Sequence, residues 1–140
     1  MGPAIELRGL TKDYGSLRAL DGVSLTVEPG EIFGFLGPNG AGKTTAIRLL
    51  FDLIRPTAGS AFVHGFDCQR QPLEARDHMG YLPGDLHLYE NLTGQQTIEF
   101  FGSFRGGVNA AFVTHVAGRL DLDTSRVLKQ YSKGNRQKLG

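Results

Sequence analysis

The chain has 140 residues, of which 40% are hydrophobic and 21% are charged, as in an ordinary globular domain with a core. Its formal net charge of +1 offers no electrostatic case for binding nucleic acid or an anionic membrane. The single cysteine, Cys68, excludes an internal disulfide and predicts a packing role in a reducing compartment. We find no signal peptide and no apolar run of about 18 residues, so we expect that the chain does not cross a membrane by itself.

The first elements in chain order are predicted strands. Residues 4–10 alternate apolar and polar side chains, residues 19–27 predict a second strand, and the Pro-Gly pair within residues 28–31 marks a turn. The apolar run 32–36 then predicts a buried strand. This strand leads directly into a glycine-rich loop.

The loop at residues 37–45 carries the complete phosphate-binding pattern G-x-x-x-x-G-K-[ST]. Its glycines let successive backbone N–H groups point at phosphate oxygens, and a helix beginning near Gly42 adds its N-terminal dipole. Lys43 can reach the β- and γ-phosphates, and the Thr44 hydroxyl can ligate Mg²⁺. The alternative is a glycine-rich turn that happens to contain Lys-Thr, which the strand–loop–helix context disfavours. The predicted binding residues are Gly37, Asn39, Gly40, Ala41, Gly42, Lys43, Thr44 and Thr45.

A helix is predicted after the loop, because apolar side chains recur there at helical spacing. It must end before Pro56. Residues 58–59 then predict a turn, residues 60–64 a short strand, and residues 79–82 another short apolar run closed by Pro-Gly. The apolar face of the helix consists of Ala46, Leu49, Leu50, Leu53 and Ile54.

The second half of the chain is predicted to be helical. Residues 93–96 have capping-box spacing and start a helix through Phe104. A further helix is predicted over residues 109–120, with an apolar face. We therefore expect a nucleotide-binding core at residues 1–90 and a helical subdomain at residues 91–140. Three aromatic residues of the first helix are expected in the core of that subdomain: Phe100, Phe101 and Phe104.

Four motifs, in order along the chain, resemble those of the nucleotide-binding domain of ABC (ATP-binding-cassette) transporters. Tyr14 falls where that family places an aromatic residue against adenine, and the loop at 37–45 matches residue for residue. Gly-Tyr-Leu-Pro-Gly-Asp at 80–85 falls at the family's Q-loop. Tyr-Ser-Lys-Gly-Asn-Arg-Gln at 131–137 resembles the signature motif, which is usually Leu-Ser-Gly-Gly-Gln. The resemblance covers nearly the whole chain.

The resemblance implies roles for three further residues. Tyr14 would offer a flat face to the purine; the alternative is an ordinary tyrosine at a strand edge. Ser132 and the Gly134 backbone N–H would hold a γ-phosphate that belongs to ATP on an opposite ATPase subunit, which implies a head-to-tail dimer. The alternative for Ser132 is a simple helix cap.

The chain departs from the family at both later motifs. Gly84 stands where the family has the Q-loop glutamine, and neither Asp85 nor Gln95 replaces it by spacing. In the signature, Tyr131 replaces Leu, Lys133 replaces Gly and Asn135 replaces Gln, although the serine and the second glycine remain.

The implied fold is α/β, a P-loop NTPase with a mixed sheet, a phosphate-loop helix and a helical subdomain, cut short inside the signature helix. The intact protein would bind ATP and Mg²⁺, dimerise, hydrolyse ATP and drive transmembrane transporter subunits from the cytoplasmic face of the cell membrane. Nucleic acid is not an expected partner.

A catalytic Asp-Glu pair after an apolar strand, which the family uses to activate water, is not found in these 140 residues. We therefore assign no catalytic residue and expect this chain alone to be inactive. The alternatives are a soluble ABC-type protein without a transport role, a kinase that shares only the phosphate loop, and a fragment without catalytic function.

Overall fold

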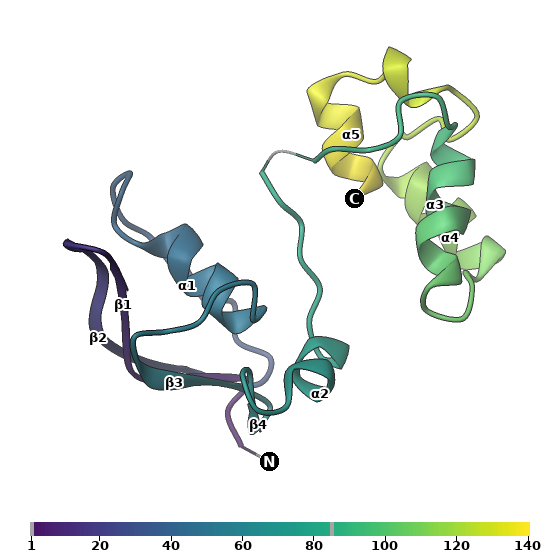
Figure 1. The fold of residues 1–140 in the computed structure, drawn as a ribbon. Helices are drawn as coiled ribbons and strands as arrows, with labels where there is room; N and C mark the ends of the chain where they lie inside the picture. Colours follow the sequence, from purple (N-terminus) through teal and green to yellow (C-terminus); the bar gives the residue numbers. More distant parts are fainter. Residues whose placement is uncertain (1, 85) are drawn as a thin grey trace. The chain divides into compact units, whose positions relative to one another are not determined.

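Residues 2–84 and 86–140 are described by a computed structural model (Figure 1). They fall into two units, Met1–Gly80 and Tyr81–Gly140. The first unit contains β1 (Ile5–Tyr14), β2 (Leu17–Val27), α1 (Lys43–Leu50), β3 (Ala58–Val63), β4 (Phe66–Asp67) and α2 (Pro72–Asp77). The second contains α3 (Gly94–Ser103), α4 (Ala110–Arg119), the 3₁₀ helix η1 (Leu128–Gln130) and α5 (Lys133–Leu139). The predicted domain boundary at residue 90 stays a prediction.

The sheet of the first unit has the strand order β2-β1-β3-β4, and every pairing is antiparallel. β1 and β2 form a hairpin that closes with Tyr14 opposite Leu17. Gly15 sits in the turn of this hairpin with a φ of 59°, a conformation that glycine adopts without strain. The predicted strands at 4–10 and 19–27 are confirmed, and each is longer than predicted.

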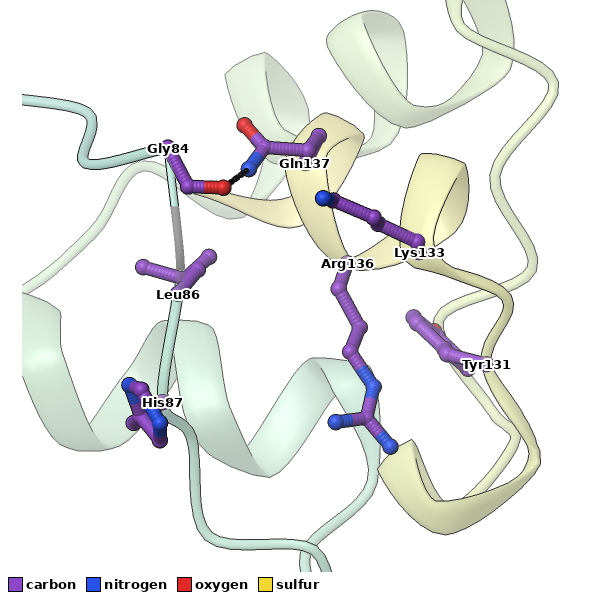
Figure 2. Close-up of a pocket in the computed structure, with 7 residues that line it drawn as sticks. All are labelled: Gly84, Leu86, His87, Tyr131, Lys133, Arg136 and Gln137. Atoms are coloured by element: carbon purple, nitrogen blue, oxygen red, sulfur yellow. Dashed lines mark hydrogen bonds between the residues drawn. The ribbon is translucent and has the colours of Figure 1, made fainter.

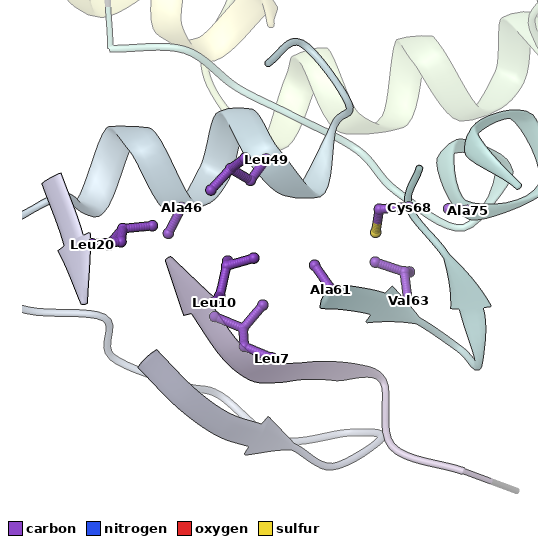
Figure 3. Close-up of a cluster of buried hydrophobic side chains, with 9 residues drawn as sticks. All are labelled: Leu7, Leu10, Leu20, Ala46, Leu49, Ala61, Val63, Cys68 and Ala75. Carbon is purple, nitrogen blue, oxygen red and sulfur yellow. The ribbon is translucent and has the colours of Figure 1, made fainter. Parts of the chain in front are cut away.

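The core of the first unit lies between α1 and the sheet (Figure 3). Ala46 and Leu49 point from α1 toward Leu10 on β1, and both leucines are fully buried. Burying such a side chain contributes about 2 kcal/mol, so this contact fixes the helix that follows the phosphate loop. The buried cluster comprises Leu7, Leu10, Leu20, Ala46, Leu49, Ala61, Val63, Cys68 and Ala75.

Cys68 belongs to this cluster, so its predicted packing role is confirmed. Burial, with Asp67 and Asp52 adding negative charge nearby, raises the pKa of its thiol to about 11. The side chain therefore stays a neutral, unreactive thiol at neutral pH.

The predicted buried strand at residues 32–36 is wrong for the part of the chain that the structure describes. The run pairs with no strand there, and Ile32 is 101% exposed and Leu36 89% exposed. Phe33 and Phe35 do alternate with them and line an apolar cavity of about 320 Å³ against β1, β2 and α1. A strand forms only where neighbouring strands accept its backbone hydrogen bonds, and within residues 2–84 and 86–140 this run has none. The sheet is therefore antiparallel there rather than mixed.

The other boundaries of the first unit agree only in part with the predictions. The helix after the loop begins at Lys43 and ends at Leu50, before Pro56 as predicted, so Leu53 and Ile54, which were predicted on its apolar face, lie beyond its end. β3 already includes Ala58 and Gly59, which were expected in a turn. The run at 79–82 forms no helix or strand. The short helix α2, with Pro72 at its first position, was not predicted.

Both predicted helices of the second unit are confirmed, and the first has the predicted capping box. The Thr93 hydroxyl accepts from the Gln96 backbone N–H at 3.2 Å, and the Gln96 side chain accepts from the Thr93 N–H at 2.9 Å. This reciprocal pair is the predicted capping box. Asn109 caps α4 by accepting from the Phe112 N–H at 3.1 Å.

The prediction that three phenylalanines form the core of this unit is wrong. Phe100 is 40% exposed, Phe101 46% and Phe104 72%. They contact one another edge to face instead, with Phe100 within 5.2 Å of both others and 5.5 Å from Tyr89 between ring centroids. The buried positions of α3 are Gly94 and Thr97, and the Gly94 N–H donates to the Arg126 oxygen in the segment after α4.

None of the helices in residues 2–84 and 86–140 has the length and apolar character needed to span a membrane.

Candidate functional site

The phosphate loop is closed by its own lysine. The Lys43 Nζ donates to the Gly37 and Pro38 carbonyl oxygens, each at 2.6 Å. The Ala41 N–H donates to the Pro38 oxygen at 3.2 Å, which tightens the same turn. The loop thus holds the Lys43 ammonium between two carbonyl oxygens, which an incoming anion would replace.

Two glycines of the loop adopt left-handed backbone conformations. Gly40 has a φ of 86° and Gly42 a φ of 83°. A Cβ at Gly42 would overlap the Ala19 carbonyl oxygen and lie 2.6 Å from the Leu20 Cδ2. Gly42 therefore lets the loop pass directly against β2, whereas Gly40 faces open space.

The helix α1 starts immediately after Gly42, which is its N-cap. The first backbone N–H groups of a helix have no partner within the helix, so those of Lys43, Thr44 and Thr45 are available to a ligand. No acidic side chain stands in the first turn, so nothing there repels an anion. Burial of Ala46 and Leu49 fixes this helix end in position.

A cavity of about 310 Å³ lies over the loop and the tip of the β1–β2 hairpin. Tyr14, at the end of β1, is 44% exposed, and the Lys12 Nζ lies 5.1 Å from its ring centroid. Leu17 and Ala19 also line the cavity, although the sequence analysis did not single them out. Their signal was the hairpin itself, since its closure places β2 beside Tyr14. The predicted residues that line it are Tyr14, Asn39, Gly40, Ala41, Gly42, Lys43, Thr44 and Thr45.

These residues fit a nucleoside triphosphate. The cavity is lined both by the exposed ring of Tyr14 and by Lys43 with the first N–H groups of α1. Among the described residues, no group of three or more His, Cys, Asp or Glu side chains is placed to hold a metal ion. A divalent cation here would therefore depend on the Thr44 hydroxyl and on the oxygens of the nucleotide itself.

Ser132 and Gly134 lie in the second unit, at the start of α5. The Ser132 Oγ accepts from the Asn135 N–H at 3.1 Å, so the serine is the N-cap of this helix. Gly134 follows on the exposed first turn, where a Cβ would meet only the Ser132 Oγ at 3.8 Å. The capping role is compatible with a phosphate contact, because the Ser132 hydroxyl hydrogen and the Gly134 N–H both remain donors.

A cavity of about 500 Å³ adjoins this turn (Figure 2). The Gln137 amide donates to the Gly84 carbonyl oxygen at 2.9 Å. Arg136, which also lines the cavity, is paired with Glu90 at 3.0 Å. Asp85 lies outside the described residues, and the Gln95 amide donates to Glu99 at 2.7 Å. The side chain that meets the Q-loop position is therefore Gln137, which sequence reasoning missed because the contact spans 53 residues.

Comparison with known proteins shows the family to which the chain is similar. A model of the family described as ABC transporter matches residues 20–140. The chain is 42% identical to the daunorubicin resistance ATP-binding protein DrrA2 of Streptomyces coeruleorubidus, over 99% of this chain and 44% of that protein. It is 45% identical to the probable multidrug ABC transporter ATP-binding protein YbhF of Escherichia coli, over 73% of this chain and 18% of that protein.

Solved structures confirm the fold class. The ATP-binding subunit of an ABC transporter superposes with a TM-score of 0.81 at 27% identity, over 97% of this chain and 59% of that one. A dimeric ATP-binding cassette, MJ0796, bound to ADP and Pi, superposes with a TM-score of 0.77 at 23% identity, over 96% of this chain and 66% of that one. The α/β P-loop NTPase fold is thereby confirmed.

The chain spans under half the length of DrrA2 and a smaller share of YbhF. The match to the family model nevertheless covers most residues of this chain, including the phosphate loop and the signature turn, residues 131–137. This chain belongs to the ABC transporter family.

Proposed function

We propose that this chain is the ATP-binding part of an ABC transporter subunit. The observation that carries the proposal is the cavity in which Tyr14, the phosphate loop and the start of α1 meet. In this proposal, adenine lies against Tyr14 and the phosphates lie on the loop N–H groups. The names of DrrA2, an ATP-binding protein, and of YbhF, a probable ABC transporter ATP-binding protein, support it.

Lys43 carries the electrostatic part of binding. Its ammonium exchanges the Gly37 and Pro38 carbonyl oxygens for β- and γ-phosphate oxygens, which are full anions rather than dipoles. The Thr44 hydroxyl would hold Mg²⁺, which would supply positive charge to the phosphates. Asn39 and the backbone of residues 40–45 enclose the phosphates.

The signature turn serves a second copy of the ATPase. Ser132 and the Gly134 N–H donate to the γ-phosphate of ATP bound on the partner copy, so that two nucleotides lie in a head-to-tail interface. The fold likeness to MJ0796, a dimeric ATP-binding cassette, supports this arrangement. The assembled subunits act on transmembrane partners at the cytoplasmic face of the cell membrane. A drug export role is suggested by the relatives' names.

We assign no general base within residues 1–140. Binding and hydrolysis are therefore separate proposals for this chain. Only binding is expected from the 140 residues themselves.

Titration calorimetry with ATP, ADP, AMP and adenosine tests the binding proposal. ATP and ADP should bind, and AMP should bind at least about tenfold more weakly, because the loop contributes through the phosphates beyond the first. Equal affinity for ATP and adenosine would show that the cavity reads the base alone and would overturn the assignment of the loop.

A further inference from the structure

Tyr131, the residue directly before Ser132, is almost fully buried although it ends in a hydroxyl. Its side chain is 6% exposed, and its Oη donates to the Asp123 carbonyl oxygen at 2.6 Å. A buried tyrosine hydroxyl needs such a partner, because leaving it unpaired costs about 1–3 kcal/mol. The signature turn is therefore attached to a point eight residues earlier in the chain.

Gly94, the first residue of α3, makes room for that hydroxyl. A Cβ at Gly94 would overlap the Tyr131 hydroxyl oxygen. It would also lie 3.0 Å from the Thr124 Cα and 3.1 Å from the Thr124 carbonyl oxygen, and these are backbone atoms that cannot turn aside. The Tyr131 hydroxyl thus occupies space that is open because Gly94, 37 positions earlier, has no side chain.

The acceptor of the Tyr131 hydroxyl is itself held against the start of α3. The Gly94 N–H donates to the Arg126 oxygen at 3.1 Å, and the Gln95 N–H donates to the Thr124 oxygen at 2.8 Å. These bonds satisfy helix N–H groups that would otherwise lack partners. The segment that carries Asp123 is therefore a fixed support.

We propose that Gly94 and Tyr131 form a matched pair that positions the Ser132 turn. With the tyrosine ring seated on the α3 start, the chain leaves Tyr131 in one direction, which places the Ser132 Oγ on the Asn135 N–H and exposes Gly134. The leucine usual at this place in the family motif has no hydroxyl to anchor. The pair makes Tyr131 a positioning residue for the phosphate contact, and this purpose rests on the proposed function.

Amide hydrogen exchange of the 140-residue chain tests the pair without nucleotide. Tyr131→Phe removes only the anchoring hydroxyl, and it should speed exchange of the Asn135 amide about fivefold, as expected for a net hydrogen bond. Amides of the β1–β2 ladder, in the first unit, serve as the internal reference and should not change.

The double variant separates a matched pair from two independent contacts. Gly94→Ala should speed Asn135 exchange more than Tyr131→Phe does, because its Cβ meets the hydroxyl and the Thr124 backbone. In Gly94→Ala/Tyr131→Phe the hydroxyl overlap is gone, so the combined factor should fall below the product of the single factors. A combined factor equal to the product of the two single factors would overturn the proposal. So would an unchanged exchange rate of the Asn135 amide in Tyr131→Phe.

ATP-dependent self-association, followed by sedimentation, shows whether the pair acts on the phosphate contact. Tyr131→Phe should weaken association while leaving the calorimetric ATP affinity at the phosphate loop unchanged. Ser132→Ala, which removes the proposed phosphate donor itself, is the positive control and should show the same pattern. An equal fall in both quantities would indicate general destabilisation and contradict a positioning role. Association of wild-type chain that ignores ATP would instead refute the proposed dimer, and the exchange result would still decide the pair.

Discussion

The Lys43 ammonium donates to the Gly37 carbonyl oxygen at 2.6 Å, so the phosphate loop is folded around its own cation. The lysine lines the same cavity as Tyr14. A ligand that binds here must form stronger contacts with Lys43 than the two carbonyl oxygens do. A polyphosphate does so because its oxygens carry charge.

Tyr14 should discriminate between ATP and free triphosphate. Tyr14→Ala should weaken ATP binding several-fold, by about the 1 kcal/mol that an aromatic contact contributes, and leave triphosphate binding unchanged. Tyr14→Phe keeps the ring and should behave as wild type. Calorimetry with both ligands measures the difference, and an unchanged ATP affinity in the alanine variant would make Tyr14 structural.

Gly42 and Gly40 give a matched test of close packing. Both have positive φ, so alanine at either position should cost about 1 kcal/mol of backbone strain. Only at Gly42 does the added Cβ overlap β2, so Gly42→Ala should lower the free energy of unfolding by at least about 1 kcal/mol more. Urea denaturation of the two variants measures this, and equal losses would show that the loop is free to move away from Ala19.

Cys68 should make stability depend on pH in the alkaline range. Its thiol has a pKa raised from 9.0 to about 11 in the folded chain, so the unfolded chain loses its proton first. The contribution is fully present below pH 9 and is lost as the pH rises from 9 toward 11, with a slope of at most about 1.4 kcal/mol per pH unit. Urea denaturation of wild type and Cys68→Ala across this range should therefore converge at high pH. Parallel curves would contradict the shift.

Purified chain 1–140 should release phosphate from ATP only at the background rate. General-base catalysis typically contributes about 10²–10⁴-fold, and no base is assigned in these residues. A malachite-green assay with the Lys43→Ala variant as blank measures it. Robust turnover that this variant abolishes would mean that the catalytic machinery has been misplaced.

Local chemistry made much of the fold predictable. The capping box joins Thr93 and Gln96, three positions apart, and the phosphate loop closes through Lys43 and Gly37, six positions apart, so a short stretch of sequence contains each interaction. The strand predicted at 32–36 failed because its existence depends on neighbours that are not local.

The same limit explains what was missed at the site. Apolar spacing placed Phe100 on a helix face but did not reveal whether anything covers that face. The bond from Gln137 to Gly84 and the fit of Tyr131 over Gly94 join residues 53 and 37 positions apart, through tertiary packing alone. Residue types at single positions do not predict such long-range contacts.

The central claim is that Lys43 anchors nucleotide phosphates. Its most direct test is calorimetric titration of ATP into wild type, Lys43→Ala and the control Lys129→Ala, which removes an equal charge from an exposed position of the second unit. A charge-assisted contact contributes about 1.5–3 kcal/mol, so Lys43→Ala should weaken ATP binding at least about tenfold while Lys129→Ala binds as wild type. Equal ATP affinities for all three proteins would contradict the account.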